Sequence, residues 1–385
     1  MRIALLTDGI WPYRIGGMQK HSYYLVKYFA QQGVYVDLYH MNDSKYDINK
    51  LEFFTGEEKK FITPFVFTFP NKGKWPWHYL QESYLHSKMM YDCFIKQPPV
   101  DFIYSKGYTG WYFIKRKQQR EKLPPIGLRL HGYEIFQRGS GAINLYRKYL
   151  YLPLMKYLNN KADYVYSYGG GITDIIKTNL PHTASKIIEV PAAIESAWIC
   201  ENNITVKTPI SFAFLGRYEI RKGVKELSAA LKNLIGKYNF QFDFVGPIPD
   251  EFKINSPQIK YHGPISDAEK IKTILQSTDV FVLPSHAEGM PNVILEAMAS
   301  GCAILATDVG AVNVMVDECN GWLIQPLSSI SIEQKIIEII EADLKIIESK
   351  KSASVKKITE NFMWDKIISK EINYIRGIIA GKRYF

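Results

Sequence analysis

Short apolar segments rich in β-branched and aromatic residues alternate with longer segments of helical period along most of this chain. This alternation is typical of βαβ units, whose strands pair in parallel beneath helices. It predicts an α/β fold and excludes a coiled coil. The expected strands are residues 3–7, 34–40, 102–105, 126–131, 164–167, 187–191, 211–216, 242–246, 280–284, 303–307 and 322–324.

The strand series divides at residues 192–208, which follow neither period. A length of 385 residues also favours two domains, at about 150 residues each. We therefore expect two doubly wound, Rossmann-like domains facing a central cleft, with an amino-terminal domain at 1–193 and a carboxy-terminal domain at 194–361.

The net charge of +10 comes from the first half of the chain. Residues 1–195 hold 26 Lys and Arg against 16 Asp and Glu, and residues 196–385 hold 22 of each kind. This asymmetry indicates an anionic partner for the first domain, such as nucleic acid, an anionic membrane or a phosphorylated substrate. A solvated, Lys-rich surface is the alternative.

The compartment is predicted from what the sequence lacks. No apolar run reaches the roughly 18 residues that span a bilayer, and the first residues do not resemble a signal peptide. The four cysteines lie far apart, which fits a reducing compartment and disfavours a zinc site. We expect a cytoplasmic protein.

Residues 53–94 interrupt the alternation and are crowded with aromatic side chains and lysines, as in Lys59-Lys60-Phe61 and Lys74-Trp75-Pro76-Trp77. Core packing of an inserted subdomain would explain most of these aromatic residues. The alternative is an amphipathic surface on a membrane, with Trp and Tyr at headgroup depth and Lys near anionic lipid.

Loops that follow strands are where doubly wound domains bind ligands. After the first strand, Gly16 and Gly17 let the backbone approach a phosphate at a helix start, although turns also use glycine for conformation alone. The first strand of the second domain is followed by Gly216-Arg217-Tyr218-Glu219-Ile220-Arg221-Lys222-Gly223. Its cations predict a diphosphate site that can neutralise a leaving group, with a solvated loop as the alternative.

The most specific segment is residues 288–301, EGMPNVILEAMASG. Pro291 suits the first turn of a helix that ends near Gly301, so Glu288 precedes the helix and Glu296 lies within it. The helix start favours an anion, and the two carboxylates can accept hydrogen bonds from sugar hydroxyls on either side of a diphosphate. Glu296 has apolar neighbours, where an unpaired charge would be costly, which weighs against a surface role.

Together, Gly16-Gly17, Arg217 with Lys222, and Glu288-x7-Glu296 resemble the retaining, nucleotide-sugar-dependent glycosyltransferases of the GT-B fold, called group 1 or family four. The resemblance covers nearly the whole chain. It implies a nucleoside diphosphate sugar as co-substrate, with UDP-sugar favoured over GDP-mannose, and no cofactor. It also implies that a helix at 362–385 crosses back onto the first domain. The chain has no Asp-x-Asp motif, which fits a metal-independent enzyme.

The resemblance implies a role for each matching residue. Arg217 and Lys222 would bind the donor diphosphate and stabilise its departure, while Glu288 and His131 would lie near the transferred sugar. A core or capping role is the alternative for His131, and His21 is given an acceptor-side or structural role. Ala192-Ala193-Ile194-Glu195 stands where relatives have an Asn-Gly-Ile-Asp-like turn, so contacts there are not carried over. Donor binding is implied for Gly16, Gly17, Gly216, Arg217, Lys222, Gly289, Met290, Asn292, Val293 and, on the ribose hydroxyls, Glu296.

The function predicted from this resemblance is retaining transfer of a hexosyl unit from the nucleotide sugar to a glycan or lipid-linked acceptor. Such a reaction belongs to surface polysaccharide or lipopolysaccharide assembly, at the inner face of the cell membrane. The expected partners are the donor, the acceptor and an anionic membrane surface, without nucleic acid. The alternatives are an epimerase or phosphorylase with the same fold and a nucleic-acid-binding protein.

Overall fold

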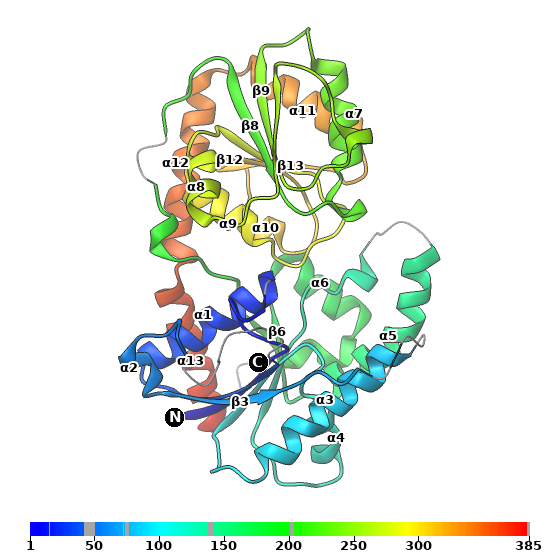
Figure 1. The fold of residues 1–385 in the computed structure, drawn as a ribbon, viewed down its shortest axis with the longest axis vertical. Helices are drawn as coiled ribbons and strands as arrows, with labels where there is room; N and C mark the ends of the chain where they lie inside the picture. Colours follow the sequence, from blue (N-terminus) through cyan, green and yellow to red (C-terminus); the bar gives the residue numbers. More distant parts are fainter. Residues whose placement is uncertain are drawn as a thin grey trace.

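Two parallel sheets with flanking helices form two domains, one above the other in Figure 1. The computed structural model describes residues 1–14, 16–41, 51–71, 73, 77–137, 142–200 and 204–382, with the backbone alone over 142–148. The amino-terminal domain runs β1 (Arg2–Leu6), α1 (Gly17–Gln31), β2 (Tyr35–Met41), α2 (Gly56–Lys59), β3 (Ile62–Phe67), α3 (His78–Phe94), β4 (Phe102–Lys106), α4 (Trp111–Gln118), β5 (Ile126–Arg129), α5 (Ala142–Lys161), β6 (Tyr164–Ser167), α6 (Gly170–Asn179) and β7 (Ile187–Glu189).

The carboxy-terminal domain repeats this alternation and then returns to the first domain in a final helix. Its elements are β8 (Ile210–Leu215), α7 (Val224–Leu234), β9 (Phe240–Val245), β10 (Ile259–Gly263), α8 (Ala268–Gln276), β11 (Val280–Leu283), α9 (Asn292–Ala299), β12 (Ala303–Thr307), α10 (Val312–Met315), β13 (Gly321–Ile324), α11 (Ser329–Glu341) and α12 (Leu344–Asn361), followed by α13 (Trp364–Ile379).

The strand orders are β3-β2-β1-β4-β5-β6-β7 and β10-β9-β8-β11-β12-β13. In both sheets the order reverses beside the first strand of the domain, and a ligand site is expected outside such a switch point. The predicted α/β fold with parallel strands is confirmed, and each of the eleven expected strands is present. The sequence missed β3 and β10, which lie at equivalent edges of the two sheets.

The segment 53–94 supplies α2, β3 and α3 to the first domain, and β3 pairs with β2 in its sheet. The expectation of an inserted subdomain is therefore wrong. Most of its described aromatic side chains pack: the ring of Phe65 stacks on Tyr39 with centroids 4.6 Å apart. Trp77 is 57% exposed. Residues 72 and 74–76, in the lysine-rich part of this segment, lie outside the described residues.

Both faces of the amino-terminal sheet are buried, which explains why its central strands read as continuous apolar runs. On β1, Ile3 and Leu5 pack into the core with α1 and α13, whereas Ala4 and Leu6 face the opposite core with α3 and α4. Successive side chains of a strand point to opposite faces, so one short segment serves two cores.

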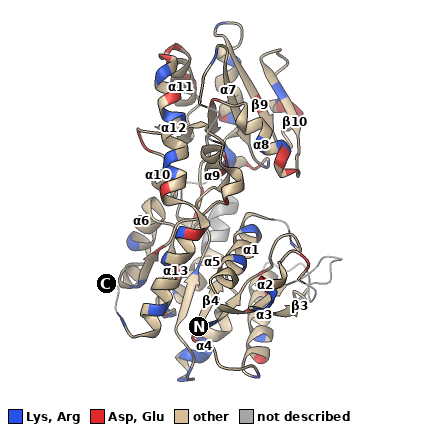
Figure 2. Ribbon diagram, turned by 90° about the vertical axis from the view of Figure 1, so that its left-hand side faces the viewer, with Lys and Arg blue, Asp and Glu red and all other residues tan. Residues whose placement is uncertain are grey.

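Helix α13 crosses from the carboxy-terminal domain and packs beside α1, as both views show (Figures 1 and 2). The crossing is held by the backbone: Ile194 N–H donates to Phe362 O at 2.8 Å, and Trp364 N–H donates to Ile194 O at 3.3 Å. The Trp364 ring then stacks on Tyr28 of α1, with centroids 5.4 Å apart. The last helix is therefore part of the first domain's core.

A buried ion pair fixes α13 to the sheet. Arg129 Nη2 of β5 lies 3.2 Å from Glu371 Oε1, and both side chains are 1% exposed. The same carboxylate oxygen accepts a hydrogen bond from Tyr104 at 2.7 Å. Removing one partner of such a pair leaves an uncompensated buried charge.

We expect Glu371→Gln to lower the free energy of unfolding by about 3–5 kcal/mol, because it removes the charge opposite Arg129 while keeping the side-chain shape. Urea denaturation of both proteins measures the difference. The matched control is Lys370→Gln, at an exposed position of the same helix, which should change stability by less than about 0.5 kcal/mol. Equal effects of the two substitutions would contradict this role.

Candidate active site

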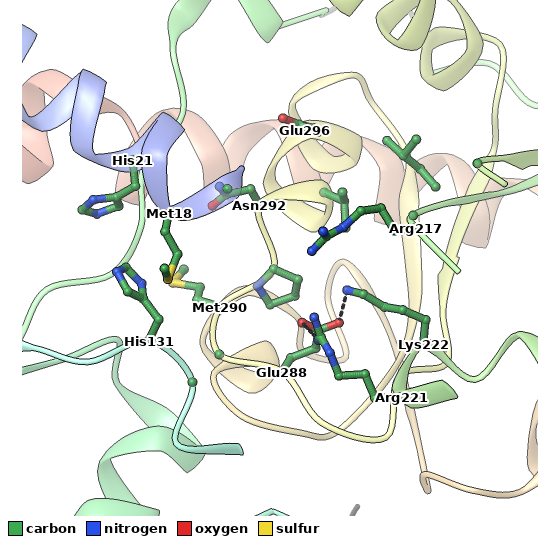
Figure 3. Close-up of a pocket in the computed structure, with 18 of the residues that line it drawn as sticks. Met18, His21, His131, Arg217, Arg221, Lys222, Glu288, Met290, Asn292 and Glu296 are labelled. Carbon is green, nitrogen blue, oxygen red and sulfur yellow. Dashed lines mark hydrogen bonds and ion pairs between the residues drawn. The ribbon is translucent and has the colours of Figure 1, made fainter. Parts of the chain in front are cut away.

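A cavity of about 500 Å³ lies between the two domains, where the start of α1 and the loop after β5 face α9 and the loops after β8, β9 and β11 (Figure 3). Every site residue expected from the sequence lines this cavity except Gly16, which immediately precedes α1. The cavity holds Gly17, His131, Gly216, Arg217, Lys222, Glu288, Gly289, Met290, Asn292, Val293 and Glu296.

Lys222 and Glu288 form the centre of the polar side of this cavity (Figure 3). Lys222 Nζ lies 2.6 Å from Glu288 Oε1. The loop that presents Lys222 turns at Gly223, which has φ +69°. A Cβ there would lie 2.0 Å from the carbonyl oxygen of Pro284, so only glycine allows the β8 and β11 loops to approach this closely.

Glu288 is 5% exposed, yet both of its carboxylate oxygens have partners. Oε1 also accepts a hydrogen bond from Ser285 Oγ at 2.7 Å, and Oε2 lies 3.4 Å from Arg221 Nη1. Arg221 was not among the expected site residues, although it stands beside Lys222 in the same basic loop. These contacts hold the carboxylate in one orientation.

Arg217 lies at the open side of the cavity, and its side chain is 82% exposed. Its Nη2 lies 3.1 Å from Glu219 Oε1, and Glu219 also holds Arg221 Nε at 2.7 Å. An exposed pair of this kind contributes little free energy. Arg217 is therefore available to move onto a ligand, whereas Lys222 is already held.

Glu296 is joined to the opposite domain. Lys20 Nζ of α1 lies 2.7 Å from Glu296 Oε1 of α9, and the same ammonium lies 5.2 Å from the centre of the Trp198 ring. This ion pair compensates the negative charge of Glu296, which lies among apolar neighbours in the sequence. Lys20 had no signal in the sequence, since its partner is 276 residues away.

Two helix starts face the cavity without side-chain caps. Gly16 and Pro291 occupy the N-cap positions of α1 and α9, and no side chain of a described residue caps either helix. The first N–H groups of both helices are therefore left for solvent or an anion. The Asn292 side chain of α9 lies against Gly17 of α1, which brings the two starts together.

Gln137 joins the two domains beside Glu288. It was also not among the expected site residues. Its Nε2 donates to the carbonyl oxygens of Glu288 and Gly132, each at 2.6 Å, and its Oε1 accepts from Glu288 N–H at 3.1 Å. Gly289 lies against Gly132 at the same place, where a Cβ would come within 3.0 Å of the Gly132 Cα. One amide side chain thus fixes the loop that carries Glu288.

His21 and His131, which line the cavity from the amino-terminal domain, are uncharged. Burial, followed by the charges of Lys106 and Arg129, holds the pKa of His131 well below its usual value, and the same causes in the same order act on the pKa of His21. His131 Nδ1 lies 2.8 Å from Tyr168 Oη, while its Nε2 has no hydrogen-bond partner among the described residues. His131 can therefore offer a hydrogen bond to a sugar but no positive charge to a phosphate.

Lys106 lies behind these histidines. Its Nζ contacts three polar atoms: Ser22 Oγ at 2.6 Å, Met18 O at 3.1 Å and His21 Nδ1 at 3.1 Å. Burial, followed by the Arg129 charge, lowers the pKa of Lys106 to about 7. In the unfolded chain the pKa is about 10.4, so between these values the unfolded state binds one proton more and stability rises with pH.

Lys106→Met should remove this pH dependence. Between pH 7 and 9, the free energy of unfolding of the unsubstituted protein should rise by up to about 1.4 kcal/mol per pH unit more than that of the variant. Denaturant titrations at pH 7, 8 and 9 measure both slopes. Lys345→Met, at an exposed position, is the control and should keep the original slope. Parallel slopes for the original and Lys106→Met proteins would show that Lys106 stays charged.

Part of the chain matches known glycosyltransferases. Residues 209–342 match the family model described as glycosyl transferases group 1. A relative from Campylobacter jejuni, N,N'-diacetylbacillosaminyl-diphospho-undecaprenol alpha-1,3-N-acetylgalactosaminyltransferase, is 33% identical over 141 residues, which are 34% of this chain and 36% of that protein. The chain spans about a third of the length of the curated relatives that it matches at above 30% identity.

Solved structures match over nearly the full length. Sucrose-phosphate synthase from Thermosynechococcus elongatus has a TM-score of 0.80 at 18% identity, covering 99% of this chain and 100% of that one. HepE of Anabaena in complex with UDP-glucose has a TM-score of 0.64 at 16% identity, covering 97% of this chain and 100% of that one. These likenesses show the fold. The chain therefore has the GT-B fold, and residues 209–342 of its carboxy-terminal domain match the group 1 glycosyltransferase model.

Proposed function

We propose that this protein is a retaining glycosyltransferase, which moves a hexosyl unit from a nucleoside diphosphate sugar to a glycan or lipid-linked acceptor in surface polysaccharide or lipopolysaccharide assembly. The observation that carries the proposal is the convergence of Lys222, Glu288 and the uncapped start of α9 on one cavity between the domains. The Campylobacter relative, named as a transferase acting on a diphospho-undecaprenol-linked sugar, supports the acceptor class.

Lys222, Arg217 and the first N–H groups of α9 would bind the donor diphosphate. Glu288 takes one of the three N–H donors of the Lys222 ammonium, which leaves two for phosphate oxygens. Negative charge develops on the departing diphosphate as the bond to the sugar breaks, and fixed positive groups lower the energy of that state. In this proposal side chains and a helix start supply the positive charge, so no metal ion is required.

Glu288 would orient the donor sugar. Its carboxylate is held by Ser285, Lys222 and Arg221, which suits a fixed acceptor of hydrogen bonds from sugar hydroxyls better than a mobile nucleophile. Retention would then follow from attack on the face that the diphosphate leaves. The acceptor oxygen bonds to the anomeric carbon as the bond to the phosphate oxygen breaks, and the acceptor proton passes to the departing phosphate.

The nucleoside would extend toward the outer end of the cavity, with Glu296 near its ribose. The wall beyond the diphosphate site is mainly apolar and suits the faces of a base; it comprises Leu215, Val245, Pro264, Ile265 and Ile271. We propose a UDP-sugar rather than GDP-mannose because HepE, with the same fold, binds UDP-glucose.

We further propose that the amino-terminal domain rests on an anionic membrane. Trp77, Tyr84 and Trp111 line a shallow depression over α3 and α4, and Lys115 Nζ lies 2.7 Å from Tyr84 Oη. Figure 2 shows the basic residues of α4 at the end of the molecule away from the carboxy-terminal domain. Aromatic rings beside cations suit the headgroup region of a membrane. Within the described residues, no helix is long and apolar enough to cross a bilayer.

Lys222→Ala should lower the turnover number about 100- to 1,000-fold, because it removes a cation aimed at the leaving group. Mass-spectrometric detection of the glycosylated acceptor, with UDP-sugars and GDP-mannose as donors, measures the rate. Lys225→Ala, at an exposed position three residues along the chain, is the control and should keep the rate. Near-normal transfer by Lys222→Ala would contradict the proposed site, and product formed without acceptor would favour the epimerase or phosphorylase alternative.

The membrane proposal predicts flotation with vesicles that contain phosphatidylglycerol, weakening several-fold as salt is raised from 50 to about 500 mM. Trp77→Ser should reduce the floated fraction because it removes an anchor in the depression. Ile330→Ser is the matched control, since Ile330 is 65% exposed on α11 of the other domain. Flotation that is unaffected by Trp77→Ser would place the contact elsewhere, and the absence of binding would reject it.

A further inference from the structure

A second cavity, of about 240 Å³, opens from the first one into the amino-terminal domain and shares Met18, His131 and Glu134 with it. We infer that this second cavity binds an uncharged pyranose ring of the acceptor and rejects anionic sugars such as uronic acids. The inference rests on the proposed function for the reaction, but the binding preference can be measured without it.

Three aromatic side chains form one wall of the second cavity. The ring centroid of Tyr79 lies 6.2 Å from that of Phe69 and 6.4 Å from that of Tyr108. Tyr79 is 44% exposed, so part of its ring is open to a ligand. The face of an aromatic ring is electron-rich and attracts the C–H groups on the apolar face of a sugar. A cavity of this size is below the range of about 300–1,000 Å³ found for larger ligands, which fits one ring.

His86 lines the cavity and carries an unpaired ring nitrogen. The residue is 2% exposed, and its Nε2 has no hydrogen-bond partner within the described part of the chain. Burial, followed by the Arg14 charge, lowers the pKa of His86 to about 4, so the imidazole is neutral at physiological pH. Leaving such a buried nitrogen without a partner is unfavourable, and a hydrogen bond to a sugar hydroxyl would relieve that cost.

Lys106, the one lysine among the described residues that line the cavity, has no donor left for an anion. A lysine ammonium has three N–H donors, and Lys106 Nζ already contacts Met18 O, His21 Nδ1 and Ser22 Oγ. If Lys106 is neutral, it donates to two of these atoms and accepts from the His21 N–H, so all three contacts remain. Among the described residues that line the cavity, a carboxylate or phosphate would therefore find no free cationic donor.

Two carboxylates also line the cavity. Asp8 Oδ2 accepts a hydrogen bond from Gln19 Nε2 at 3.1 Å, and Glu134 stands where the two cavities meet. Arg14 lies behind Asp8 and gives its Nη1 to the Asp8 carbonyl oxygen at 2.8 Å, but it does not line the cavity. Carboxylates accept hydrogen bonds from hydroxyls and repel anions. Their placement selects for an uncharged ring.

Glu134 has a further role at the junction. Burial raises the pKa of its carboxyl; the Arg221 charge opposes this shift, and the charges of Glu288 and Glu219 add to it. Glu134 and the Nε2 of His131 are the polar groups that a hydroxyl would meet on its way from the second cavity to the donor. They would hold the attacking hydroxyl toward the anomeric carbon.

Saturation-transfer NMR of the full chain, with methyl β-glucoside and methyl β-glucuronide as probes, tests the binding preference without any donor. We expect transfer to the glucoside and at least a tenfold weaker signal for the glucuronide at equal concentration. Ser83→Phe, which fills the cavity from α3, should abolish the glucoside signal. Met89→Phe is the control, because Met89 is 40% exposed on α3 and outside the cavity.

Equal signals for the two probes, a glucoside signal that survives Ser83→Phe, or no signal for either probe would overturn the inference. Thermal shifts with UDP and hydrolysis of the UDP-sugar, measured on the same variants, report on the donor site alone. If these persist while the sugar preference is absent, the proposed function stands and only the acceptor inference fails. If UDP binding and UDP-sugar hydrolysis are absent while the sugar preference remains, the proposed function fails and the second cavity still binds an uncharged sugar.

Discussion

A buried carboxylate is stable only beside a cation or several hydrogen-bond donors, and this constraint organises the cleft. Glu288 has Lys222 and Ser285 from its own domain, whereas Glu296 takes Lys20 from the other one. A second pair, Lys27 with Glu195 at 2.7 Å, lies on the same side. Glu296, which would contact the donor ribose, therefore also joins the two domains, so ligand binding and domain position would be linked through this carboxylate.

The crossing helix α13 packs against the elements that form the amino-terminal side of the cleft. Glu371 meets Arg129 at the end of β5, and the loop that follows this strand carries His131 and Glu134. The Arg129–Glu371 pair thus attaches α13 to β5. The loop after β5 carries residues that line both cavities. A chain segment that begins in one domain positions the site residues of the other.

The sequence predicted the strands, the two-domain α/β fold and a set of site residues that, apart from Gly16, lines one cavity, because these depend on local patterns. It missed β3 and β10, which are edge strands with partly exposed residues; Pro64 interrupts β3, and β10 (IKYHG) has no apolar run. It also missed Lys20 and Gln137. Their roles arise from contacts with Glu296 and Glu288, which only the folded chain brings within reach, and no periodicity reports such a contact.

The basic composition of the first domain describes its surface charge and not the charge of its second cavity. Its basic excess suggested an anionic partner, yet the second cavity has two carboxylates and a lysine whose contacts are all internal. The exposed cations lie elsewhere, as on α4, where Lys115 stands beside Tyr84. In the proposed enzyme, attraction to an anionic membrane and recognition of an uncharged sugar are therefore separate properties of one domain. Long-range charge would bring the domain to the membrane, and short-range hydrogen bonds and ring contacts would select the acceptor.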